Sequence, residues 1–123
     1  MADDQIIIQG NVANVPEAHI CYALDAMHIV YEFQFRLWGA MGIRGSILID
    51  WVCYVPRPTP LEYFGDYWHE GLMAADDVMR LSRIAKYFGV ARDKIAIYGS
   101  EIDAETDKGT IMSILREKLG AGA

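Results

Sequence analysis

Asp50 is the residue whose type and position most directly suggest chemistry. It lies inside an apolar run at 46–55 that predicts a strand, and its neighbours on the same face, Leu48 and Val52, are apolar. Ionising a buried carboxyl group costs several kcal/mol unless a partner is present, so burial would raise its pKa. A carboxyl group poised in that way can act as a general acid or base. The alternative is a structural carboxylate at a sheet edge or beside a helix N-terminus.

His69 is the second candidate for proton transfer, because histidine titrates near neutral pH. It lies in an aromatic and acidic segment at 61–71. If this segment is helical, Glu62, Asp66 and His69 share one face and could hold a divalent cation weakly, with water or another subunit completing the site. One histidine without an HExxH motif does not predict a zinc centre, so no metal site is assigned. A loop anchored by its own aromatic side chains is the alternative.

Further aromatic and polar residues could form a pocket for a small molecule. The aromatic candidates are Trp51, Tyr54, Tyr63 and Trp68. Ser100 and Glu101 follow a predicted strand at 94–98, and open α/β sheets bind ligands beyond the carboxyl ends of their strands. The loop at 10–14 lies at another such end, but it lacks GxGxxG and P-loop spacing. The sequence therefore predicts a ligand site at strand ends and in segment 61–71, and it identifies no cofactor.

Six elements are predicted to position these residues. Short β-branched and apolar runs predict strands, and apolar residues at helical spacing between capping residues predict helices. The predicted strands are 4–9, 46–55 and 94–98, and the predicted helices are 16–38, 73–88 and 107–119. The order β-α-β-α-β-α predicts an α/β fold, a small three-layer sandwich with a mostly parallel sheet. A ferredoxin-like α+β fold, with a hairpin hidden in the long second strand, is the alternative.

The predicted helix 73–88 follows a proline-rich connector. Three prolines at 56–60 predict extended backbone outside the sheet interior, because proline cannot donate to a strand ladder. The helix itself is amphipathic, and the spacing of Asp76 and Arg80 is typical of an ion pair on a helix surface.

The predicted helix 16–38 is apolar over more than half of its circumference, with one narrow polar stripe. A domain of 123 residues has too little chain to cover such a helix on all sides, so we expect a homo-oligomer with its interface within 20–41. The same helix supports a different function, that of a non-catalytic assembly or adaptor subunit. An enzyme would enclose a cavity with an ionisable group, whereas an adaptor would expose this apolar surface.

Composition narrows the classes of function. The 123 residues are 53% hydrophobic and 23% charged, which predicts one domain over 1–123. A net charge of −6 opposes binding to nucleic acid and to anionic membranes, and the apolar stretches are too short to predict a membrane span. Two cysteines without CxxC spacing, and a start without the basic residues of a secretory signal, predict a cytoplasmic protein with reduced thiols.

Together these patterns predict a small, oligomeric, cytoplasmic α/β protein that binds or transforms a small molecule. Asp50 and His69 would transfer protons, and the aromatic residues would form the walls of the site. The alternative is the assembly or adaptor subunit, with helix 16–38 as its interface. The sequence leaves the ligand, the reaction and the number of subunits open.

Overall fold

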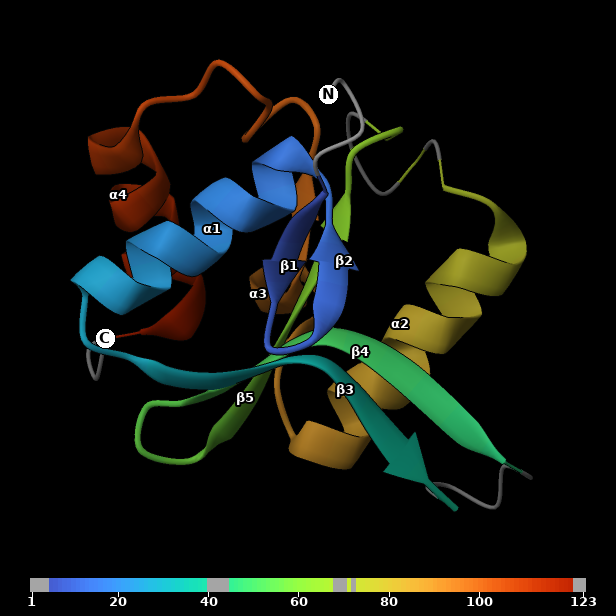
Figure 1. The fold of residues 1–123 in the computed structure, drawn as a ribbon. Helices are drawn as coiled ribbons and strands as arrows, with labels where there is room; N and C mark the ends of the chain where they lie inside the picture. Colours follow the sequence, from blue (N-terminus) through green and yellow to red (C-terminus); the bar gives the residue numbers. More distant parts are fainter. Residues whose placement is uncertain (1–4, 40–44, 68–70, 72, 121–123) are drawn as a thin grey trace.

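The computed structural model describes residues 5–39, 45–67, 71 and 73–120, which form six strands and four helices (Figure 1). In chain order the elements are β1 (Ile6–Ile8), β2 (Asn11–Ala13), α1 (Val15–Ala26), β3 (Val30–Trp38), β4 (Ser46–Tyr54), β5 (Pro58–Phe64), α2 (Ala75–Phe88), α3 (Arg92–Ile95), β6 (Ala96–Tyr98) and α4 (Lys108–Leu119). Within these residues no helix is both long enough and apolar enough to cross a membrane.

The sheet topology contradicts the predicted parallel sandwich. β1 and β2 form a separate antiparallel hairpin, and the other strands form one sheet in the order β3-β4-β5-β6. The β3–β4 and β4–β5 pairs are antiparallel, and β5 and β6 are parallel. The fold is therefore a mixed α+β fold with a mostly antiparallel four-stranded sheet, and the α/β prediction is wrong.

The predicted helix 16–38 is in fact a helix followed by a strand, which is the main cause of this error. α1 ends at Ala26, and His28 has a left-handed backbone (φ 59°) that turns the chain into β3. In the first part of β3, buried Tyr31 and Phe33 alternate with the more exposed Glu32 and Gln34. This alternation is the period of a strand with one buried face, and it prevails over the apolar residues at helical spacing.

A hairpin occupies the stretch where the sequence predicted a loop between strand and helix. Gln9 and Gly10 both have positive φ (50° and 82°), and Ile8 pairs with Asn11 across them. Two central residues with positive φ are typical of the tight turn that joins antiparallel strands. The predicted loop at 10–14 is therefore mostly β2, and its glycine serves this turn.

Three helix ends lie within one residue of the predicted bounds, and each has a residue that caps it. Asn14 caps α1, because its Oδ1 accepts from the Glu17 N–H at 2.8 Å while Glu17 Oε1 accepts from the Asn14 N–H at 3.0 Å. Gly89 ends α2 in a left-handed conformation, with φ 71°. Asp107 caps α4, and its Oδ2 accepts from the Thr110 N–H at 3.1 Å.

The predicted connector at 56–60 belongs partly to β5. Pro58 pairs with Tyr54 and Pro60 pairs with Val52, whereas β6 runs beside β5 only from Glu62 onward. Both prolines thus lie where β4 is the one strand beside β5 among the described residues. A proline can lie at such a place when its missing N–H would point to the open side, because no ladder hydrogen bond is lost.

The sheet separates two apolar clusters. One cluster packs α1, α4 and the hairpin against one face, and the other packs α2 against the opposite face. Figure 1 shows α1 and α4 on one side of the sheet strands and α2 on the other. Helices on both faces leave the sheet largely buried, so a polar side chain inside it needs a partner.

The alternation of faces along β4 breaks at Asp50. Ile49 packs in the α2 cluster and Trp51 in the opposite cluster, although residues two apart in a regular strand share a face. Gln34, which stands opposite in β3, has a left-handed backbone (φ 60°). The sequence predicted that Asp50 shares one continuous apolar face with Leu48 and Val52. The break at Asp50 shows that this prediction is wrong.

Candidate functional site

The candidate site lies where β5 leaves β4. The ladder between the two strands ends at the pair Trp51 and Leu61, and from Glu62 onward β5 pairs with β6. At this point side chains replace backbone partners. The Asp50 N–H donates to Glu62 Oε2 at 2.6 Å, and the Tyr63 N–H donates to Asp50 Oδ2 at 2.8 Å. We call Asp50 and Glu62 the carboxyl pair.

Arg80 of α2 supplies a positive charge to this pair. Its Nη2 forms an ion pair with Glu62 Oε1 and also donates to the Leu48 carbonyl oxygen. Glu62 is only 1% exposed, so its charge needs such a partner. The predicted surface pair between Asp76 and Arg80 is replaced by this contact with the sheet.

The environment raises the pKa of both carboxyl groups. Burial is the largest cause for Asp50 and raises its pKa to about 6, against the lowering effect of the Tyr63 N–H. Burial also raises the pKa of Glu62, and the neighbouring charge of Asp50 raises it further, while Arg80 opposes both effects. Two neighbouring carboxyl groups resist ionising together, so protons bind to them as a pair. The predicted rise in the pKa of Asp50 is thus confirmed.

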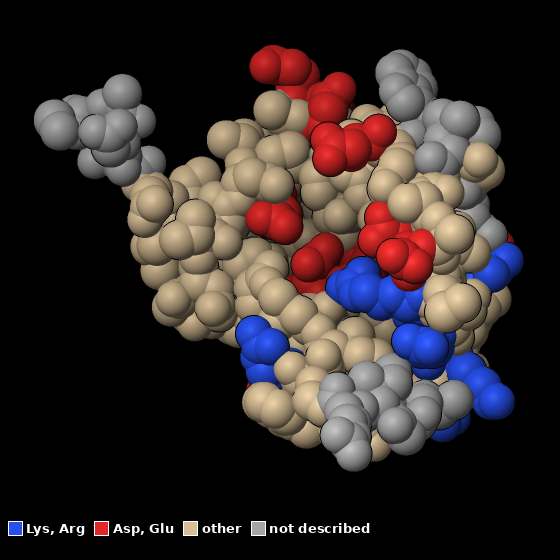
Figure 2. Space-filling view, turned by 90° about the vertical axis from the view of Figure 1, so that its right-hand side faces the viewer, with Lys and Arg blue, Asp and Glu red and all other residues tan. Residues whose placement is uncertain are grey.

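More acids surround the carboxyl pair. The charge of Glu17, in the first turn of α1, acts to raise the pKa of Asp50. Burial, and then the charges of Asp103, Glu17 and Asp66, raise the pKa of the Tyr63 phenol. We call Glu17, Asp50, Asp66 and Asp103 the acidic surface. Figure 2 shows acidic side chains gathered around a hollow on one face, with basic side chains directly beside it.

Two of the predicted ligand walls have partners elsewhere in the fold. Trp51 is fully buried, its ring centroid lies 5.5 Å from that of Phe33, and its Nε1–H donates to Cys21 Sγ at 3.3 Å. Tyr54 is exposed and donates through its hydroxyl to Glu32. It stands four residues from Asp50, about 13 Å along the strand.

The loops after β5 and β6 meet, as expected for neighbouring strand ends. The Gly99 N–H donates to the Phe64 carbonyl oxygen at 3.1 Å, and a Cβ at Gly99 would lie 2.2 Å from the Gly65 carbonyl oxygen. Tyr63, just before this contact, donates through its hydroxyl to the Ile102 carbonyl oxygen at 2.7 Å. Residues 61–67 and the loop with Ser100 and Glu101 are therefore adjacent.

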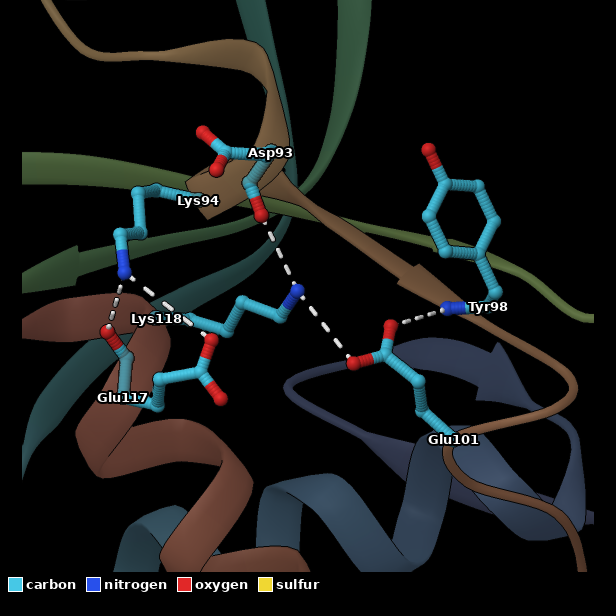
Figure 3. A network of polar contacts seen from close by, with 6 residues as sticks. All are labelled: Asp93, Lys94, Tyr98, Glu101, Glu117 and Lys118. Carbon is cyan, nitrogen blue, oxygen red and sulfur yellow. Dashed lines mark hydrogen bonds and ion pairs between the residues drawn. The ribbon is translucent and has the colours of Figure 1, made fainter. Parts of the chain in front are cut away.

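Ser100 and Glu101 occupy this second loop in different ways. Ser100 is exposed in the turn after β6. Glu101 Oε1 accepts from the Tyr98 N–H at 3.0 Å, and Glu101 Oε2 pairs with Lys118 Nζ at 3.3 Å (Figure 3). Lys118, only 8% exposed, also donates to the Asp93 carbonyl oxygen at 3.0 Å. Glu101 therefore ties α4 to the end of β6.

The predicted cation site on segment 61–71 does not form as proposed. Glu62 lies in β5 and Asp66 is exposed in the following turn, so no helical face joins them. His69 and Trp68 lie outside the described residues. The described part of the chain contains no group of three or more His, Cys, Asp or Glu side chains that could hold a metal ion.

Sequence reasoning missed the partners of Asp50. Glu62 was considered only as a helical neighbour of Asp66, and Arg80 only as a surface residue. A signal was present, because Asp50 and Glu62 are each six residues from Pro56. A hairpin centred on that proline places the two acids opposite each other, as the β4–β5 register does when it is continued one pair beyond Trp51 and Leu61. Comparison with known protein families, curated proteins and solved structures finds no match to this chain.

Proposed function

We propose that the carboxyl pair is the functional centre of the protein and acts as a general acid and base on a small molecule. The observation that carries this proposal is a partly exposed Asp50 whose backbone N–H binds the carboxylate of the buried Glu62, so that two acids lie side by side inside a sheet. A sheet that needed only stability has little use for two acids there. The pair can release and recover one proton near neutral pH, which general acid–base catalysis requires.

Each member of the pair has a distinct role in this proposal. Asp50 is the group that meets the substrate, because Glu62 is almost completely buried. The Tyr63 N–H fixes Asp50 Oδ2, and a positioned carboxylate is a better base than one that rotates freely. Glu62 exchanges a proton with Asp50 and so resets it after turnover. His69 remains a proposed proton carrier on segment 61–71.

A nitrobenzisoxazole tests for a poised base without knowledge of the natural substrate. A base removes the ring C–H proton, the C–H electrons form the nitrile bond, and the N–O bond breaks to release a coloured phenolate. We expect Asp50→Asn to lower the rate about a hundredfold, and the wild-type rate to rise with pH as Asp50 ionises. Asp93→Asn is the matched control, because it makes the same substitution at an exposed position outside the carboxyl pair. Equal rates for wild type and Asp50→Asn would overturn the proposal.

A second candidate function is the binding of a divalent cation together with a phosphate-bearing substrate. The observation that favours it is that, among the described residues, several carboxylates but one guanidinium, that of Arg80, act on the carboxyl pair and Tyr63. Mg²⁺ often uses one or two carboxylates, with water and substrate phosphate completing its shell, so two protein ligands suffice. We expect Mn²⁺ alone to bind weakly and to broaden the NMR signals of Tyr63. Equal broadening in Asp50→Asn would exclude the carboxyl pair as its ligand.

We still propose a homo-oligomer, but with a different interface from the predicted helix. Its predicted interface helix ends at Ala26, and Tyr31, within the predicted interface 20–41, is buried in the core. The exposed apolar side chains of β3 are Val30 (69%) and Trp38 (68%), and β3 is an edge strand of the four-stranded sheet. We expect sedimentation to show a dimer or larger species that Trp38→Lys converts to monomer. A wild-type monomer at tens of micromolar would exclude this.

The remaining proposals concern location and partners. Both Cys21 and Cys53 are free and buried, which suits a reducing compartment, and we propose a cytoplasmic location. The acidic surface repels phosphate backbones, so we propose that the protein binds no nucleic acid by itself. The adaptor alternative stays a proposal with a changed interface, because residues 30–38 of its proposed helix form a sheet edge that exposes Val30 and Trp38. Salt-sensitive binding to duplex DNA would contradict the proposal that the protein binds no nucleic acid.

A further inference from the structure

Arg80 connects three parts of the candidate site. It projects from α2, and its Nη2 contacts both the Leu48 carbonyl oxygen of β4 and the Glu62 carboxylate of β5. The two strands separate between these contacts, because their ladder ends at Trp51 and Leu61. Arg80 thus bridges the strands at the place where backbone hydrogen bonds no longer join them.

We propose that Arg80 is a positioning residue for the carboxyl pair. By binding Leu48 and Glu62 together, it holds Glu62 between the strands as the proton partner of Asp50. This inference rests on the proposed acid–base function of the pair.

The hydrogen bonds of Glu62 show why its position depends on Arg80. One carboxylate oxygen, Oε1, is held by Arg80, and the other, Oε2, accepts from the Asp50 N–H. The backbone contact fixes only one oxygen and leaves the carboxyl group free to rotate about it. With Arg80 in place both oxygens are fixed, and the orientation of Glu62 toward Asp50 is set.

The helix that carries Arg80 is itself firmly placed. Leu81, Ile84 and Ala85 of α2 are buried in the cluster that covers this face of the sheet. The Arg80 side chain is 34% exposed, so its guanidinium reaches the pair from the solvent side of that packing. Arginine stays charged across the whole working pH range, so its influence on the pair is constant while the carboxyl groups titrate.

Arg80 also influences the proton affinity of the pair. Its charge opposes the effect of burial on both Asp50 and Glu62. Without it, the pair would keep its protons to higher pH, and less ionised Asp50 would be present at neutral pH. A merely structural role would change stability but leave the titration of a folded variant unchanged. The two roles therefore predict different results.

The test compares Arg80→Met, Arg80→Lys and Arg83→Met by carboxyl-carbon NMR titration of the folded proteins. We expect Arg80→Met to lower the proton dissociation constant of the pair about tenfold or more, and to move the nitrobenzisoxazole rate profile to higher pH. Arg83 is exposed on the same helix, so Arg83→Met should match wild type. Arg80→Lys keeps the charge and provides a folded variant if Arg80→Met unfolds. It should retain a near-wild-type titration with a reduced rate, because lysine lacks the planar guanidinium.

Unchanged titration in folded Arg80→Met would overturn the inference, as would an Arg80→Lys variant with the wild-type rate. The outcome for the function itself is separate. If Asp50→Asn abolishes the reaction while Arg80→Met titrates as wild type, the proposed function stands and the role of Arg80 fails. If Arg80→Met shifts the titration while Asp50→Asn leaves the rate unchanged, Arg80 positions a pair that is not a base, and the proposed function fails.

Discussion

Two acid–cation networks of this protein look alike in outline but differ in charge balance. At the end of β6, Glu101 pairs with the buried Lys118, and each Glu101 oxygen has its own donor (Figure 3). Where β4 and β5 separate, Arg80 pairs with Glu62, and its charge also acts on the neighbouring carboxyl group of Asp50. One acid and one cation satisfy each other and form a structural tie. A second acid leaves an excess of negative charge, which a proton or another cation must balance.

The two networks also differ in which member is buried. Glu101 has a side chain that is 28% exposed, whereas that of Glu62 is 1% exposed. In the first network the cation is the buried member, and in the second the buried member is the acid. Water can therefore replace a lost partner of Glu101, but not a lost partner of Glu62. The comparison predicts unequal costs when the cation is removed from each.

Removal of the two cations gives the largest expected difference in stability. Arg80→Met should lower the free energy of unfolding by about 2–3 kcal/mol at about pH 8, because a buried carboxylate loses its partner. Lys118→Met should cost only about 1 kcal/mol, since Glu101 is partly solvated and the methionine fills the space. Urea denaturation of both variants measures this. Equal losses at pH 8 would remove the distinction between the networks.

The pH dependence of Arg80→Met sharpens the same comparison. Loss of Arg80 raises the pKa of Glu62 in the folded state further above its unfolded value. A raised folded-state pKa stabilises the protein at low pH and loses that contribution as pH rises. The cost of Arg80→Met should therefore shrink between about pH 8 and pH 5. A cost that stays constant over this range would mean that Glu62 does not take up a proton.

Replacement of Asp50 gives the next largest effect. Its pKa is about 6 when folded and about 4 in an unfolded chain, so the folded protein binds more protons between these values. On acidification from about pH 8 to pH 4, wild type should gain about 1–3 kcal/mol relative to Asp50→Asn. Thermal unfolding across this range measures the gain.

Asp107 provides a control with the opposite sign. Hydrogen bonds from Thr110 at the start of α4 lower the pKa of Asp107. Its stabilising contribution is present above its unfolded pKa and disappears as pH falls through the folded value. Wild type should therefore lose stability relative to Asp107→Asn on acidification. If the difference between wild type and Asp50→Asn had the same sign, Asp50 would be a structural carboxylate held by its donors.

Asp50 could be predicted as a candidate site residue from the sequence, but its partners Glu62 and Arg80 could not. An aspartate within an apolar strand is visible as an anomaly from local pattern alone, and its raised pKa follows from burial. Glu62 and Arg80 acquire their roles from strand pairing and helix packing, which are contacts between distant residues. A turn at Pro56 would have allowed the β4–β5 hairpin to be predicted from the sequence. The three prolines at 56–60 argued against a strand there.

The fold was missed for a related reason. Residues 29–38 fit both a helical and a strand period, because aromatic residues occupy positions that satisfy either. The left-handed His28 decides between them, and a histidine in that conformation has no clear local signature. Helices with strong caps, α1 at its start and α4 throughout, were predictable because capping is chemistry between near neighbours.

The smallest expected effect separates the backbone of Tyr63 from its side chain. Its N–H holds Asp50, whereas its hydroxyl donates to the Ile102 carbonyl oxygen at 2.7 Å. Tyr63→Phe removes only the second bond, so the free energy of unfolding should fall by about 1 kcal/mol. The nitrobenzisoxazole rate should stay at the wild-type value, because the donor to Asp50 is untouched.

Tyr54→Phe is the matched control for this change. It also removes one tyrosine hydroxyl bond, to Glu32, but at an exposed position where water replaces the partner. Its cost should therefore be about 0.5 kcal/mol or less. If Tyr63→Phe slowed the reaction while leaving stability unchanged, the phenol itself would be the proton donor at the site. The role of proton partner to Asp50 would then belong to Tyr63 and not to Glu62.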